Sequence, residues 1–155
     1  MPTIEDIRSL FHSQVPRDWF EGPPKVEADD EEILCVGTLP AGQAVDDFRE
    51  RTRAERMTIA AEAEGRFRRK VSWGVERDGA STLFTTLNAP VMTRLRLPER
   101  AVLDTLVEAG VARSRSEALS WCVKLVGRHQ GEWLQDLREA LVGVEHAREG
   151  GPTLI

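Results

Sequence analysis

The sequence has few cysteines and histidines and no long apolar run. Its 155 residues include 2 cysteines and 3 histidines. They form no CxxC, HExxH or helically spaced histidine pair, so neither a metal site nor a cofactor is expected. Cys35 and Cys122 are far apart, and each lies in an apolar run, which is typical of reduced, buried cysteines in a cytoplasmic protein. Because no apolar run is long enough, the sequence predicts no membrane span.

Two further absences limit the function. The first residues lack a basic segment followed by an apolar core, so we expect no secretory signal and a cytoplasmic location. The glycines of residues 37–42 lack the lysine and the spacing of a phosphate-binding loop. No Ser/His/Asp, Cys/His or paired-carboxylate constellation stands out either. The sequence therefore favours a binding protein over an enzyme.

Residues 91–126 carry the most informative pattern. At its start, residues alternate as they do in a strand, where successive side chains point to opposite faces. One predicted face carries Thr93, Leu95 and Leu97, and the other carries Met92, Arg94 and Arg96. Two arginines on the free face of a strand suit the reading of guanine edges, because arginine can donate two parallel hydrogen bonds there.

Signals for two helices follow this strand. Pro98 fits near a helix start, apolar residues recur at helical spacing over 102–107, and Gly110 is a natural helix stop. The run Ser114–Glu117 predicts a capping box. A helix that begins there also offers free N–H groups and a positive dipole end to a DNA phosphate. Because a short strand with two bare edges is unstable unless it pairs, the pattern also predicts a dimer.

The stretch resembles the ribbon-helix-helix family of DNA-binding proteins, of the MetJ/Arc type. The resemblance is carried by residues 94–98, Arg-Leu-Arg-Leu-Pro, and by residues 110–119, Gly-Val-Ala-Arg-Ser-Arg-Ser-Glu-Ala-Leu. It implies that two chains pair their strands into an antiparallel ribbon, which enters the major groove of double-stranded DNA. In members of that family the ribbon is often near the N-terminus, whereas here it follows the first 90 residues.

The resemblance and the helical spacing together give a role to individual residues. The residues expected to read bases are Met92, Arg94 and Arg96. Those expected to hold DNA phosphates are Ser114, Arg115 and Ser116. Those expected to form the dimer core are Leu95, Leu97, Val102, Leu106, Leu119, Cys122 and Val126.

The net charge of −5 is unevenly distributed along the chain. Residues 1–50 carry 4 basic and 12 acidic groups, whereas residues 92–128 carry 7 basic and 4 acidic groups. The predicted DNA-binding segment is therefore basic within an acidic protein. Its small surplus of positive charge predicts modest nonspecific affinity, because neutralisation of phosphates supplies most of that affinity.

The remaining sequence predicts an α+β fold with three parts. Residues 1–88 form an α-β-β-α-β-β module, residues 91–127 the ribbon-helix-helix segment, and residues 131–148 a C-terminal amphipathic helix. The module's predicted helices span 3–13 and 43–68, and its strands span 25–28, 32–39, 70–75 and 81–87. A hairpin turn is expected at Asp78-Gly79.

The longest predicted helix, over 43–68, presents an apolar face and many arginines. The face is expected to consist of Phe48, Met57, Ile59, Ala60, Ala63 and Phe67. Its arginines are interleaved with glutamates, which indicates paired charge on a solvated face or a second surface for phosphates. The acidic cluster at residues 29–31 is either a solvated turn or a site for a divalent ion, although it lacks the spaced ligands of a calcium loop.

Two hypotheses from different classes remain open. The first is a homodimeric DNA-binding transcriptional regulator, whose N-terminal module senses a ligand or engages a protein partner. The second is an adaptor or assembly protein, or an antitoxin-like partner binder, that uses the 91–126 segment only to dimerise. In either case Trp121 and Leu125 would form a sticky patch if exposed. We expect the helix at 132–147 to cover them through Trp133, Leu137 and Leu141, or else the N-terminal module or a wider dimer core to do so.

Overall fold

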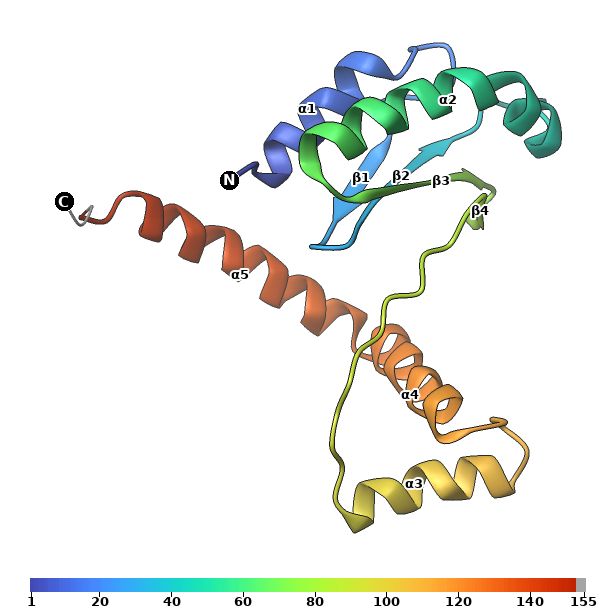
Figure 1. Cartoon of the computed structure of the whole chain (residues 1–155), viewed down its shortest axis with the longest axis vertical. Helices are drawn as coiled ribbons and strands as arrows, with labels where there is room; N and C mark the ends of the chain where they lie inside the picture. The colour runs from blue at the N-terminus through green and yellow to red at the C-terminus, as the bar shows by residue number, and fades with distance from the viewer. Residues whose placement is uncertain (153–155) are drawn as a thin grey trace. The chain divides into compact units, whose positions relative to one another are not determined.

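The computed structural model describes residues 1–152, and its chain forms two compact units, Met1–Val91 and a second that begins at Met92. The first unit has the α-β-β-α-β-β order that the sequence predicted. Its elements are α1 (Ile4–Gln14), β1 (Lys25–Ala28), β2 (Glu32–Thr38), α2 (Val45–Phe67), β3 (Lys70–Arg77) and β4 (Ala80–Leu83) (Figure 1). The α+β fold class is thereby confirmed.

The strands of the first unit form one mixed sheet in the order β1-β2-β3-β4. The outer pairs, β1–β2 and β3–β4, are antiparallel. The inner pair, β2–β3, is parallel, with Cys35 opposite Trp73. A parallel pair requires a long crossover connection, and α2 provides it. The apolar run of residues 33–36 lies in β2, which has a neighbour on each side.

The core of this unit lies between the sheet and its two helices. Both α1 and α2 cover the same face of the sheet (Figure 1). Ile33 and Cys35 in β2 and Trp73 and Val75 in β3 are buried, as expected for alternate residues of inner strands. They meet a cluster of aromatic rings whose contacting centroids lie 5.3–6.3 Å apart. The cluster consists of Phe11, Trp19, Phe20, Phe48, Trp73 and Phe84.

Side chains also fix the ends and turns of these elements. Thr3 caps α1 through a reciprocal capping box with Asp6. In the acidic turn, the Asp29 carboxylate accepts hydrogen bonds from the N–H groups of Glu31 and Glu32, at 2.9 and 2.8 Å. The bonds from Glu32 and Glu31 lower the pKa of Asp29. This carboxylate therefore closes the turn, which accounts for part of the acidic cluster without an ion.

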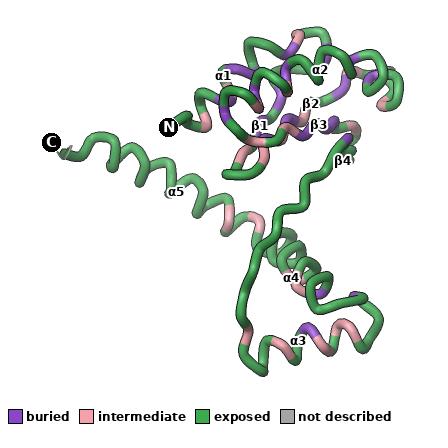
Figure 2. Tube along the Cα trace, viewed as in Figure 1, coloured by how far each residue is buried: buried purple, intermediate pink, exposed green. Residues whose placement is uncertain are grey.

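The second unit is a run of helices, α3 (Leu97–Glu108), α4 (Arg115–His129) and α5 (Gly131–Glu149). Gly110 has a φ of 78°, and its N–H donates to the Val107 carbonyl, so it ends α3 as predicted. No described helix is both long and apolar enough to span a bilayer. Figure 2 shows how few buried residues this unit holds. The buried apolar ones are Leu103, Ala112 and Ala118.

The predicted strand over residues 92–97 is not formed in the single chain. Residues 92–96 have no regular secondary structure, and α3 begins at Leu97 with Pro98 in its first turn. The physical reason is that a strand needs a partner for its backbone hydrogen bonds. The ribbon-helix-helix arrangement is accordingly not confirmed by this fold.

Gly37 is required by the close approach of a core ring. A Cβ atom at this position in β2 would lie 2.2–2.4 Å from three ring carbons of Phe20, which is itself buried. Overpacking of this kind costs about 1–3 kcal/mol, so we expect Gly37→Ala to lower the free energy of unfolding by that amount. The matched control is Gly65→Ala in α2, where nothing lies within 4 Å.

Because alanine favours helix, the control should raise stability by about 0.5–1 kcal/mol. Urea denaturation followed by tryptophan fluorescence measures both changes. Equal effects of the two substitutions would show that the Phe20 ring does not restrict residue 37.

Candidate functional site

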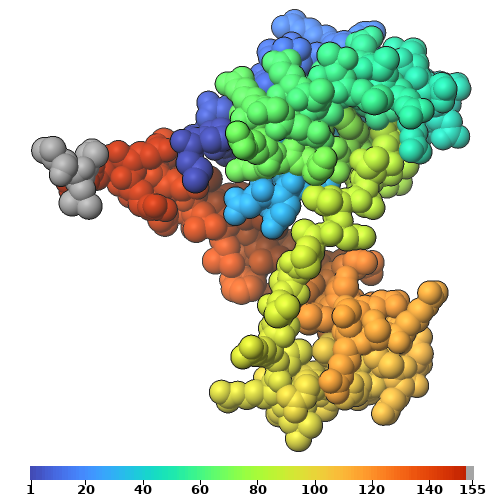
Figure 3. All heavy atoms as spheres, in the orientation of Figure 1, coloured from blue at the N-terminus to red at the C-terminus, as the bar shows by residue number. Residues whose placement is uncertain are grey.

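The segment predicted to read DNA is extended and accessible. Met92 is 94% exposed, and Arg94 and Arg96 are exposed as well. Arg96 is the N-cap residue of α3. Within residues 1–152 no hydrogen bond or ion pair engages the side chain of Arg94 or Arg96. In Figure 3 the chain before α3 is a single extended line of atoms. Both guanidinium groups are therefore available to a partner.

The predicted phosphate-binding helix start is formed, with one change. Ser114 is the N-cap of α4, and its hydroxyl accepts from the Glu117 N–H at 3.1 Å. The Glu117 carboxylate, however, accepts from the Arg113 N–H at 3.3 Å instead of from the cap residue. The capping box is thus only half formed. Ser116 is exposed in the first turn of the helix.

Arg115, predicted to hold a phosphate, has a carboxylate partner in its own chain. Its Nε and Nη2 donate to the two carboxylate oxygens of Asp104 at 2.8 and 2.9 Å. This bidentate pair lowers the pKa of Asp104 and raises that of Arg115. Since Asp104 lies in α3, the pair ties the start of α4 to that helix. A DNA phosphate would have to compete with Asp104 for the guanidinium.

The residues predicted to form a dimer core divide into two groups in the single chain. Leu95, Leu106, Leu119 and Cys122 are partly buried and pack against the small core of this unit. The exposed group consists of Leu97 at 69%, Val102 at 54% and Val126 at 49%. These three side chains have too little cover in one chain to form a core.

α5 does not cover Trp121 and Leu125, contrary to our first expectation. The two side chains remain 39% and 37% exposed. On α5, the residues expected to cover them are exposed too, with Trp133 at 57%, Leu137 at 44% and Leu141 at 59%. α5 extends away from α4 along a separate axis (Figure 1). Its apolar side chains are thus a second uncovered surface.

The structure also shows a cavity in the first unit that sequence periodicity did not reveal. The buried positions of α2 are Phe48, Thr52, Arg56, Ile59, Ala63 and Phe67. Met57, which we had assigned to the apolar face, is 63% exposed, because the spacing of the buried residues turns it away. Two polar residues thus occupy core positions of this helix. Thr52 and Arg56 follow Phe48 at helical spacing, which is a signal of burial. A search for apolar residues alone does not detect it.

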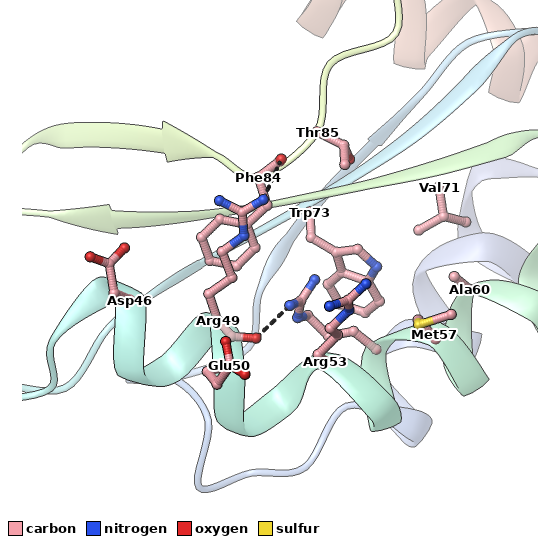
Figure 4. A pocket seen from close by; sticks show the side chains of 11 residues that line it. Asp46, Arg49, Glu50, Arg53, Met57, Ala60, Val71, Trp73, Phe84 and Thr85 are labelled. Atoms are coloured by element: carbon pink, nitrogen blue, oxygen red, sulfur yellow. Dashed lines mark hydrogen bonds between the residues drawn. The ribbon is translucent and has the colours of Figure 1, made fainter.

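The cavity has a volume of about 630 Å³, within the size range of small-molecule sites. Asp46 and Arg49 lie with Phe84 at one end, and Val71, Ala60 and Met57 lie at the other (Figure 4). The charged lining consists of Asp46, Arg49, Glu50, Arg53 and Arg56. The remaining lining consists of Met57, Ala60, Val71, Trp73, Phe84 and Thr85.

Arg56 is 8% exposed and is held by neutral groups alone. Its Nη2 donates to the Arg49 carbonyl at 2.7 Å, and its Nε donates to the Thr52 hydroxyl at 3.0 Å. The guanidinium carbon of Arg56 lies 4.9 Å from the centre of the Phe84 ring, and that of Arg49 lies 5.4 Å from it. Burial, followed by repulsion from Arg49 and Arg53, lowers the pKa of Arg56. The described residues give none of these arginines an ion pair.

Cys35 and Cys122 are free thiols, and neither is placed for metal binding. Cys35 is fully buried, and burial raises its pKa to about 12, so the thiol stays protonated at neutral pH. Cys122 is half-buried. In the part of the chain that the structure describes, no three histidine, cysteine or acidic side chains come together as a metal site.

Comparison with known proteins places the chain in a family. Residues 5–83 match the family described as "Rv1265-like protein, N-terminal domain", and residues 96–148 match "Mb1296 C-terminal domain". The proteins Mb1296 of Mycobacterium bovis and Rv1265 of Mycobacterium tuberculosis, both named as uncharacterized, are each 54% identical over 165 residues. Each alignment covers 99% of this chain and 73% of the relative. The chain therefore belongs to the Rv1265-like family. No solved structure matches it significantly.

The resemblance to the ribbon-helix-helix family is thus wrong as a family assignment. The second unit matches the Mb1296 C-terminal domain, and no ribbon-helix-helix family is recognised. The assignment depended on a proline at the start of one helix, followed by a glycine stop and a serine cap before the next. Those signals specify two helices and the turn between them, and the structure forms both. They do not specify the pairing of a preceding strand.

The Ser114 cap can be tested against its neighbour. Loss of an N-cap hydroxyl typically costs about 1 kcal/mol, so we expect Ser114→Ala to destabilise the second unit by that amount. Ser116→Ala, in the same turn, removes no hydrogen bond in the structure and should change stability by less than about 0.5 kcal/mol. Amide hydrogen exchange of α4 measures both. Similar protection in the two variants would contradict the cap.

Proposed function

We propose that the chain is a homodimeric, sequence-specific DNA-binding protein that acts as a transcriptional regulator. The observation that carries this proposal is the extended segment before α3. It presents Arg94 and Arg96 on an exposed, unpaired stretch of backbone. In the proposed dimer, the 92–96 segments of two copies pair antiparallel, and the resulting two-stranded ribbon enters the major groove.

Dimerisation is supported by the lack of cover in the second unit. Leu97, Val102 and Val126 are each about half exposed or more. Burial of apolar surface is worth about 25 cal/mol per Å², so a second copy of the same surface would gain substantially from packing there. Pairing would also satisfy the bare N–H and C=O groups of residues 92–96. Dimerisation would thus both bury the exposed apolar side chains and pair the backbone groups of residues 92–96.

DNA binding is supported by the arginines and by the start of α4. An arginine on a ribbon can donate two hydrogen bonds to guanine, and a methionine can touch a thymine methyl. In this proposal Arg94 and Arg96 read bases, with Met92 beside them. The N–H groups at the start of α4, with Ser114 and Ser116, hold the phosphate backbone. Arg115 joins them only if a phosphate displaces Asp104.

An adaptor role is the second candidate, and α5 is the observation that favours it. Its exposed apolar side chains, among them Trp133, Leu137 and Leu141, form a surface that DNA does not need. In that case the second unit would dimerise and α5 would hold a protein partner. The two proposals differ in whether the dimer binds DNA in a salt-dependent manner.

The dimer surface is tested by introducing a glutamate at each of two valines that have similar exposure. We expect Val126→Glu to dissociate the dimer at micromolar concentration, because Val126 would lie buried between the two copies. Val144→Glu places the same change on α5, at a residue of similar exposure, 52% against 49%, and should leave the dimer intact. Sedimentation velocity of the full chain gives the answer. A monomeric parent protein, or dissociation only by the α5 variant, would contradict this surface.

The base-reading role is tested on a site selected from genomic fragments by the full chain. We expect Arg94→Ala to cost roughly 1–3 kcal/mol on the best site, as for a bidentate arginine–guanine pair, and much less on random DNA. Arg138→Ala, on α5 and outside the segment, is the charge-matched control. Fluorescence anisotropy at fixed salt measures DNA binding by the parent protein and by each variant. If the Arg94/Arg96 double variant binds the best site as the parent does, base reading by this segment is excluded.

A further inference from the structure

Within the described residues 1–152, three arginines of α2 line the cavity in the first unit, and none of them forms an ion pair. Arg49, Arg53 and Arg56 are three or four residues apart, so they are neighbours on one face of the helix. Like charges at this spacing repel, and burial, followed by repulsion from Arg49 and Arg53, lowers the pKa of Arg56. An arrangement that is unfavourable for the protein alone is expected where an anion supplies the missing charge.

The free nitrogens of these arginines are accessible from the cavity. Arg53 is exposed, and within residues 1–152 its guanidinium makes no hydrogen bond. Arg56 uses Nε and Nη2 for Thr52 and the Arg49 carbonyl, which leaves Nη1 unused in the described structure. Figure 4 shows Arg53 near Trp73, with Met57 and Ala60 beyond it. A ligand held by Arg53 would therefore extend along an apolar wall.

The charge of the lining indicates what kind of anion fits. Asp46 and Glu50 also line the cavity, so its formal charge is that of three arginines less two carboxylates, or +1. A singly charged head offsets this charge, whereas a doubly charged phosphate exceeds it and meets two carboxylates. The planar fork of a free arginine also matches a carboxylate in a bidentate pair.

We propose that this cavity binds an organic monocarboxylate, whose head pairs with Arg53 and with Nη1 of Arg56 and whose apolar body lies toward Met57, Ala60 and Trp73. Arg49 adds a positive charge to the lining and also donates to the Phe84 carbonyl. All of these residues belong to the first unit. The site is thus independent of the DNA-binding proposal.

The test is a titration of the full, ¹⁵N-labelled chain with benzoate, followed at the arginine Nε–H signals by NMR. We expect saturable shifts at Arg49, Arg53 and Arg56. Benzamide, a neutral molecule of the same shape, should give none, and acetate, which lacks the apolar body, should bind more weakly than benzoate. Shifts that are as large at Arg138 as at the cavity arginines would overturn the proposal, as would the absence of saturable shifts.

Two variants on the same helix test the residues. Arg53→Gln should weaken benzoate binding roughly 10- to 100-fold, the equivalent of a lost hydrogen bond to a charged group. Arg51→Gln is the matched control, because Arg51 is exposed on α2 but does not line the cavity, and it should leave binding unchanged. Both variants should keep the parent melting temperature, since both side chains are exposed. Equal loss in the two variants would overturn the assignment.

Binding measurements with phenyl phosphate and with DNA test two other classes of ligand for the same arginines. Tighter binding of phenyl phosphate than of benzoate would overturn the choice of a carboxylate. If Arg53→Gln instead weakens DNA binding as strongly as Arg94→Ala and leaves benzoate binding unaffected, the arginines form a nucleic-acid surface and the ligand proposal fails. Loss of DNA binding in Arg94→Ala alone bears only on the regulator, so the two proposals fail separately.

Discussion

Because β2 and β3 run parallel, the chain must return along the sheet between them, and α2 is that return. The constraint determines most of the first unit. α2 has to bury one face against the sheet over its whole length, from Phe48 to Phe67. It also has to pass the end of β4, where Phe84 completes the aromatic cluster. The arginine-lined cavity forms at that passage, so its position follows from the crossover.

Burial of Arg56 at this passage has an energetic consequence. Removing a charged group from water costs several kcal/mol for full burial. Its two hydrogen bonds and its stacking on Phe84 offset part of that cost, at roughly 1.5–3 kcal/mol for each hydrogen bond to a charged group and roughly 0.5–2 kcal/mol for the stacking. These contacts hold the guanidinium in one orientation but leave its charge unneutralised. A binding site gains from such preorganisation, because the ordering cost is met before the ligand arrives.

The elements of the fold were largely predictable, because their signals are local. The hairpin at Asp78-Gly79, the Thr3 cap and the Gly110 stop each depend on a few adjacent residues. The cavity was not predictable, because periodicity counts apolar residues and passes over a buried arginine such as Arg56. The strand predicted at 92–97 is not formed, for a different reason: the partner strand that it needs would belong to another chain. The family assignment failed because helix signals alone do not identify a fold.

The two units differ in how far each is complete by itself. The first buries a continuous core, from Ile7 in α1 to Phe84 after β4. Among its described residues, the second buries three small or medium apolar side chains and leaves valines, leucines and tryptophans exposed to water. In the proposed dimer, folding of this unit would be coupled to association, because a partner that binds only the folded form stabilises it by mass action. The concentration of the chain would then set both the stability of α3 and α4 and the amount of paired 92–96 segment. In a DNA-binding dimer of this kind, occupancy of DNA would rise more steeply than protein concentration, without any conformational change in the first unit.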